Sequence, residues 1–130
     1  VARQVGMAPS AVLERIRKLE KQGFIDGYEV RLNPKRFAKS LVAFVSVKLK
    51  KLDAEIKVGQ TLSKLPQVQE VHYVAGEDAF LVKIRAADTE ALSRLIRDKI
   101  AAIAGVQSTQ TAIVLSTYKE TARIPIDKID

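Results

Sequence analysis

A basic segment near the start of the 130-residue chain has residue types that bind nucleic acid. Pro9 suits the first position of a helix, where its missing N–H costs nothing, and Gly23 suits the position after the helix ends. On this helix Val12, Ile16 and Leu19 share one face, which leaves the polar and basic residues for another surface. We therefore predict a DNA-recognition helix. Its predicted DNA contacts come from Ser10, Ala11, Glu14, Arg15, Arg17, Lys18 and Lys21.

These residues divide into two roles by their place on the helix. Ser10, Ala11 and Glu14 lie in its first half, which reaches base edges in helix-turn-helix proteins. The basic residues of the second half are placed for phosphates. Arg15 lies at the edge of the apolar face, where it can reach a phosphate or pair with a carboxylate. An ordinary solvated basic face explains the same periodicity, and that alternative stays open.

A second candidate site is the sequence Gly76-Glu77-Asp78, which lies between two predicted strands. The exposed amides of a turn can hold an anionic group, while a carboxylate takes a cationic one. An amino acid carries both charges, so the turn is a candidate amino-acid site. A glycine in a hairpin is usually explained by turn geometry alone, and that explanation also stays open.

The residues give little support to catalysis. His72 is the only histidine and cysteine is absent. In the middle of a predicted strand, His72 is expected to be a hydrogen-bonded surface residue rather than a metal ligand or a base. Without a second histidine there is no nucleophile triad, and no glycine-rich phosphate loop is present. We predict that the chain is not an enzyme and has no metal site or cofactor.

The recognition helix needs other helices to cover its apolar face. Only residues 1–5 precede the turn before it, which is about one turn of helix. We therefore expect residues 1–27 to be a partial helix-turn-helix domain in an N-terminally truncated chain that lacks the first helix. Residues 28–40 are expected to be a hinge, with a half-exposed strand over 28–32 followed by a short basic connector.

Residues 41–130 are predicted to form a second domain of alternating strands and helices. The predicted order is strand 41–49, helix 53–65, strand 68–75, strand 79–86, a helix capped by Asp88 and ended by Gly105, and strand 106–117. This order is β-α-β-β-α-β, which is ferredoxin-like. The fold class of the chain is therefore α+β.

The strands of this domain are apolar on both sides, although its helices cover only one side of the sheet. Val42 and Phe44 point opposite to their apolar neighbours in the first strand, and Leu81 does so in the third. A strand that is apolar on both sides is expected to be buried on both sides. We therefore predict a homodimer with Val42 and Phe44 in its interface.

The charge of the chain agrees with DNA binding, although a merely soluble, mildly basic protein would explain the charge equally well. The net charge is +7, and residues 1–40 hold nine basic residues against four acidic ones. Basic surfaces attract polyanions such as double-stranded DNA, because binding releases counterions from the phosphates. No apolar run is long enough to span a membrane, and no signal-peptide pattern begins the chain. The absence of cysteine fits a reducing compartment, so we expect a cytoplasmic protein with no membrane partner.

Six short segments, each weak alone, carry a family resemblance through their order and spacing. They are residues 5–12, 15–20, 23–28, 32–34, 74–80 and 105–111. With them the chain resembles the Lrp/AsnC (feast/famine) transcription regulators along essentially its whole length. Ala38 stands where that family often has glycine.

The resemblance implies a helix-turn-helix joined to a ferredoxin-like, ligand-responsive RAM domain. It implies dimers that form through the sheets and assemble into octamers. It also implies an effector, usually an amino acid, bound between dimers near the turn at Gly76. The implied effector contacts are Gly76, Glu77, Asp78, Ala79, Thr109 and Thr111.

The functional prediction is a sequence-specific, DNA-binding transcription regulator that responds to an amino acid or a related small effector. The alternative is a ligand-sensing and oligomerisation module without DNA binding, which the absent first helix motivates. A small ferredoxin-like enzyme is the third possibility, and the lack of a catalytic constellation argues against it.

Overall fold

The computed structural model describes residues 8–126, and the chain divides into two compact units between Leu32 and Asn33. The helical turn expected over residues 1–5 lies outside the described residues.

The N-terminal unit contains the predicted helix, α2, over Pro9–Lys21. Ala8 precedes it in an extended conformation and makes no side-chain cap, while Pro9 takes the first helical position. At the other end, the Gly23 N–H donates to Glu20 O (3.1 Å) and the Phe24 N–H donates to Leu19 O (2.9 Å). This pair of bonds is a Schellman motif, which satisfies carbonyls that the helix end leaves open. Both predicted helix ends are therefore confirmed.

The strand predicted over residues 28–32 is not formed, so this expectation is wrong. The apolar alternation is present, and Tyr28, Val30 and Leu32 are 70%, 85% and 63% exposed. A strand needs a neighbouring strand for its backbone hydrogen bonds, and no strand in residues 8–126 pairs with this segment. The segment leads into a short 3₁₀ helix, η1 (Pro34–Phe37), where Asn33 Oδ1 accepts from the Lys35 N–H at 3.1 Å.

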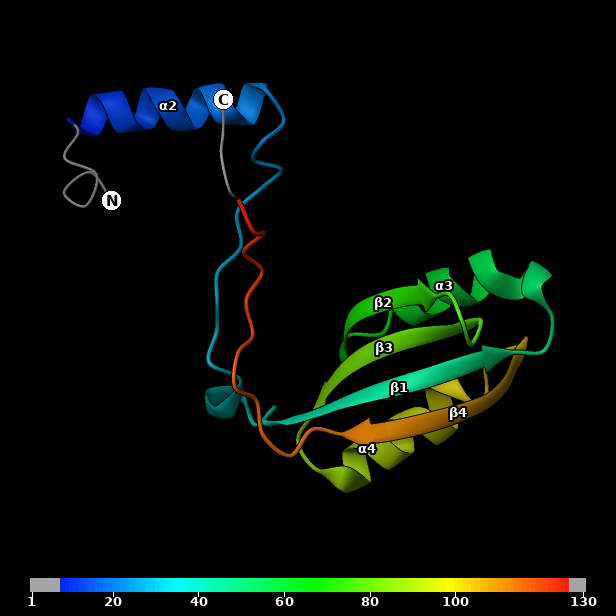
Figure 1. Cartoon of the computed structure of the whole chain (residues 1–130). Coiled ribbons are helices and arrows are strands. Elements are labelled where there is room, and N and C mark those ends of the chain that lie inside the picture. The colour runs from blue at the N-terminus through cyan, green and yellow to red at the C-terminus, as the bar shows by residue number, and fades with distance from the viewer. Residues whose placement is uncertain (1–7, 127–130) are drawn as a thin grey trace. The chain divides into compact units, whose positions relative to one another are not determined.

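The second unit is a four-stranded antiparallel sheet in the order β2-β3-β1-β4. The strands are β1 (Leu41–Leu49), β2 (Val68–Val74), β3 (Ala79–Ala86) and β4 (Val106–Ile113). A short η2 (Leu52–Ala54) and helix α3 (Glu55–Ser63) join β1 to β2, and α4 (Thr89–Leu95) with the π-helical η3 (Ile96–Ile100) joins β3 to β4. Figure 1 shows these helices on one side of the sheet and the other side uncovered. The predicted βαββαβ order and ferredoxin-like fold are confirmed.

The core lies between the sheet and the helices. Its members alternate along β1 and β3 and recur on one face of each helix, as the two periodicities require. They are Ala43, Val45, Val47, Leu49, Val58, Leu62, Phe80, Val82, Ile84, Ala86, Leu92, Leu95, Ile100 and Val106. Asp88 caps α4 as predicted, since its Oδ1 accepts from the Ala91 N–H at 2.8 Å. Strand β4 ends at Ile113, four residues before the predicted limit at Thr117.

Gly105 joins the last helix to β4 in a conformation that other residues rarely adopt. Its φ is +100°, and a Cβ there would lie 3.0 Å from Ala54 Cβ. We expect Gly105→Ala to lower the free energy of unfolding by about 1–3 kcal/mol, because it adds both backbone strain and crowding. Gly27→Ala is the matched control, since Gly27 has an ordinary φ and open surroundings. Thermal unfolding measures both variants, and equal midpoints would contradict the prediction.

Candidate functional site

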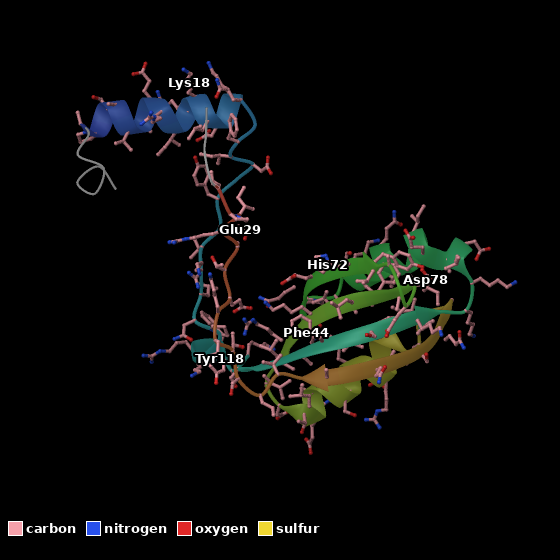
Figure 2. All side chains as sticks on the ribbon, viewed as in Figure 1. Lys18, Glu29, Phe44, His72, Asp78 and Tyr118 are labelled. Carbon is pink, nitrogen blue, oxygen red and sulfur yellow. The ribbon has the colours of Figure 1, made fainter. Side chains whose placement is uncertain are left out.

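Helix α2 has a half-buried apolar face and an exposed polar face, as predicted. Val12, Ile16 and Leu19 are half-buried, and no residue of the helix is fully buried. All the predicted DNA-contacting residues except the half-buried Ala11 are exposed. Figure 2 shows the side chains of this helix, with Lys18 labelled. The helix therefore exposes polar and basic side chains on the surface away from Val12, Ile16 and Leu19.

A hydrogen bond fixes the segment after α2 to the end of the helix. The Tyr28 hydroxyl donates to Glu20 Oε1 at 2.5 Å. This bond to a carboxylate raises the pKa of Tyr28 above its usual value, with smaller contributions from burial and from the charge of Glu20. The carboxylate of Glu20 is thereby engaged within the unit, while Lys18 and Lys21 lie in the last helical turn, where the helix dipole favours positive charge.

The candidate ligand turn is a four-residue loop between the paired residues Val74 and Ala79. Gly76 has φ +101° and Asp78 has φ +52°, so two of its residues are left-handed or nearly so. A Cβ on Gly76 would meet nothing within 4 Å, which means that the backbone, rather than crowding, requires glycine there. Glu77 and Asp78 are exposed, and Figure 2 shows Asp78 at the end of the hairpin.

The other predicted effector residues are less well placed to contact a ligand at the Gly76 turn. Ala79 is only 7% exposed, so it offers little surface to a ligand. Thr109 pairs with Val47, which pairs in turn with Phe80. Thr109 is therefore two strands away from the hairpin, at about 10 Å. Thr111 lies two residues further along β4, where it pairs with Val45. Within one chain the turn residues come together and the threonines do not join them.

Two hollows of the second unit also lie away from this turn. One, of about 400 Å³, is bordered by η1, the start of β1 and residues 114–120. The other, of about 460 Å³, lies beside α3, where Gly59 leaves space over the ring of Phe80. Neither includes the turn residues or the two threonines.

The predicted dimer residues lie on the uncovered side of the sheet. Val42 and Phe44 are half-buried and alternate with the fully buried Ala43 and Val45. Phe44 pairs with Lys83 of β3 on one side and Ala112 of β4 on the other. Figure 2 shows where Phe44 lies on β1. The prediction that β1 carries apolar residues on both of its sides is confirmed, while its role in assembly remains a prediction.

The uncovered side also carries a charged network that the sequence analysis missed. Lys83 Nζ contacts Glu120 and lies 3.4 Å from Glu70 Oε2, and its side chain is only 11% exposed. Arg85 Nη2 donates to both carboxylate oxygens of Glu120, at 2.9 and 3.1 Å, and Arg85 Nε donates to Gln69 at 2.7 Å. The two cations alternate with the buried Val82 and Ile84, a period-two signal that could have placed them on this side.

The carboxylates of this network are stabilised in their charged form. The pKa of Glu120 is lowered, first by the hydrogen bond from Lys83 and then by the charges of Lys83 and Arg85, with burial opposing. The pKa of Glu70 is lowered mainly by its hydrogen bond with His72. His72 Nε2 lies 2.9 Å from Glu70 Oε1, and its side chain is 58% exposed. The prediction that His72 is a hydrogen-bonded surface residue is confirmed.

Residues 8–126 contain neither a metal-binding cluster nor a membrane-spanning helix. No cluster of three or more His, Asp or Glu side chains in that range could hold a metal ion. No helix in the same range is long and apolar enough to cross a bilayer.

Comparison with protein families places both halves of the chain. A model described as the Lrp/AsnC ligand binding domain matches residues 42–124, and one described as a winged helix-turn-helix DNA-binding domain matches residues 1–26. The chain belongs to the Lrp/AsnC family. It is a transcription regulator that combines a helix-turn-helix DNA-binding region with an Lrp/AsnC ligand-binding domain.

Relatives of this Lrp/AsnC regulator match along nearly its whole length. It is 34% identical to the leucine-responsive regulatory protein of Escherichia coli K12, over 97% of this chain and 78% of the relative. The structure resembles that of E. coli AsnC, with a TM-score of 0.83 at 27% identity, over 95% of this chain and 83% of AsnC. It also resembles a transcriptional regulator from Neisseria meningitidis in complex with L-methionine, with a TM-score of 0.87 at 29% identity, over 97% and 82% of the two chains. The predicted family, the ferredoxin-like fold and the function as a transcription regulator with DNA-binding and ligand-binding domains are therefore confirmed.

The ion pairs of the Lrp/AsnC domain make its stability depend on pH. Glu70 and Glu120 have pKa values below the ordinary 4.5, so their contribution is complete above pH 4.5 and is lost as pH falls through the lowered values. We expect Glu120→Gln to lower the free energy of unfolding at pH 7 by about 1 kcal/mol, a small value because Glu120 is 45% exposed.

Thermal unfolding at a fixed protein concentration checks this expectation. The wild-type midpoint is expected to approach that of the Glu120→Gln variant as pH falls from 6 to 3. A constant difference between the two proteins across that range would contradict the prediction.

Proposed function

We propose that this regulator binds double-stranded DNA sequence-specifically through α2 and that an amino acid controls this binding. The observation that supports the DNA contacts is the two-sided surface of α2 within the segment that matches the helix-turn-helix model. Ser10, Ala11 and Glu14 lie in the half that reaches base edges, while Arg15, Arg17, Lys18 and Lys21 bind phosphates.

Titration of DNA at several salt concentrations separates the two roles. We expect Arg17→Ala or Lys18→Ala to weaken binding to all sequences and to reduce the slope of log K against log salt by about 1. Ser10→Ala is expected to change base preference and to leave that slope unchanged. Lys57→Ala is the matched control, because it removes one exposed lysine from α3 in the other unit.

Equal binding of the wild-type chain to operator and random DNA would overturn the proposal for sequence-specific binding. Binding to neither DNA would favour the alternative, a ligand-sensing and oligomerisation module without DNA binding.

The proposed effector is an amino acid with its charged groups at the hairpin turn. Two structural neighbours were solved with L-methionine, the N. meningitidis regulator and a feast or famine regulatory protein from M. tuberculosis at 30% identity. Here the amides of the left-handed turn at Gly76 would receive the ligand carboxylate, and Glu77 or Asp78 would receive its ammonium group. Thr109 and Thr111 are too far along the sheet to join that turn in one chain, which supports a site completed by another chain between dimers.

The proposed assembly is a dimer formed by the uncovered sheet face, with dimers then associating into octamers. Val42 and Phe44 supply apolar surface at the centre of that face. Two sheets packed in this way bury the second side of β1, whose apolar residues would otherwise contact water.

Calorimetry with a panel of amino acids, starting with L-methionine and L-leucine, tests the effector site. Asp78→Asn removes one charge while keeping the left-handed backbone, which asparagine tolerates well. We expect this variant to bind the effector at least about 10-fold more weakly, because a charge-assisted hydrogen bond is lost. Asp98→Asn, on the exposed side of η3, is the matched control. Unchanged affinity for Asp78→Asn would remove that carboxylate from the site.

A further inference from the structure

The uncovered face of the sheet holds two cations that are poorly exposed to water. The side chains of Lys83 and Arg85 are 11% and 15% exposed in a single chain. Both lie beside the apolar centre of the face, since Lys83 pairs with Phe44 and Arg85 pairs with Val42 in the β1–β3 register. Any partner that covers Phe44 therefore also covers these cations, and covering an unpaired cation is costly.

Two carboxylates balance these cations, and they come from different parts of the chain. Glu70 lies on β2, paired with Lys83 in the sheet register. Glu120 lies beyond the end of β4, in a segment with no regular secondary structure, and bridges Lys83 and Arg85. With both carboxylates the four groups have no net charge, and without Glu120 they carry one positive charge.

We infer that Glu120 of the C-terminal segment neutralises the Lys83–Arg85 pair so that a second copy of this chain can dock on the sheet face. The segment after β4 thus acts as a charge-matching element of the dimer interface. The inference rests on the proposed sheet-to-sheet dimer and adds the condition under which that dimer forms.

The size of the effect follows from the geometry of packed sheets. Face-to-face sheets lie about 10 Å apart, so two copies without Glu120 would hold two excess positive charges at about that distance. At an effective dielectric constant of about 20, their repulsion corresponds to a roughly 15-fold weaker association. Salt at about 0.1 M has a screening length of about 10 Å, so it would remove much of this repulsion.

Sedimentation equilibrium of the full chain at low and at moderate salt measures the dimer dissociation constant. We expect Glu120→Gln to raise this constant by about 10-fold or more at low salt, and the difference to shrink as salt is added. The double variant Lys83→Met, Glu120→Gln removes one charge of each sign and is expected to regain most of the wild-type association. Asp98→Asn is the control for removal of a carboxylate away from this face, and circular dichroism monitors folding.

Two further variants keep the outcomes distinct. Lys83→Met alone leaves one excess negative charge and is expected to weaken the dimer with the same salt dependence, which tests the inference even if Glu120→Gln does not fold. Phe44→Asp tests the face itself. If Phe44→Asp weakens the dimer while Glu120→Gln and Lys83→Met leave it unchanged, the inference is overturned and the face remains the interface. If Phe44→Asp also leaves the dimer unchanged, the proposed sheet-to-sheet dimer is overturned.

Discussion

The central constraint on this molecule is that β1 and β3 lie in the middle of a sheet that has helices on one side only. Their inward residues, including Val45, Val47, Val82 and Ile84, are completely buried and hold α3 and α4 in place. Their outward residues are chemically different, with Phe44 beside Lys83 and Val42 beside Arg85. The helix side explains why the domain folds, and the uncovered side is the face that the proposed dimer would bury.

The same sheet also holds the residues of the proposed effector site apart. The turn at Gly76 is held at one end of the β2–β3 hairpin, whereas Thr109 and Thr111 lie on the opposite edge strand, β4. The sheet fixes this separation, which supports the proposal that the threonines reach the ligand from another chain. A site shared between chains makes ligand binding and assembly thermodynamically linked, since each changes the free energy of the other.

Much of this arrangement could be predicted from the sequence, because alternation and helix-end signals act locally. The limits of α2 follow from Pro9 and Gly23, and the burial of β1 and β3 follows from a period of two. The prediction of a strand over residues 28–32 was wrong, because a strand needs a neighbouring strand to pair with and the local pattern does not reveal whether one is present. The contact of Glu120 with Lys83 spans 37 positions in an irregular segment, and no spacing rule indicates it.

In the proposed dimer, the uncovered sheet face matters for DNA recognition as much as α2 does. Helix α2 has 13 residues, and only its first half can reach base edges. A single helix of this kind reads a few base pairs, and each wrong pair costs only about 1–3 kcal/mol, so one copy discriminates poorly between sites. Two copies in the proposed sheet-to-sheet dimer would read two half-sites, whose spacing would have to match the DNA repeat of about 34 Å. In the proposed dimer, DNA specificity would therefore depend on Phe44 and Glu120 of the other unit as well as on α2.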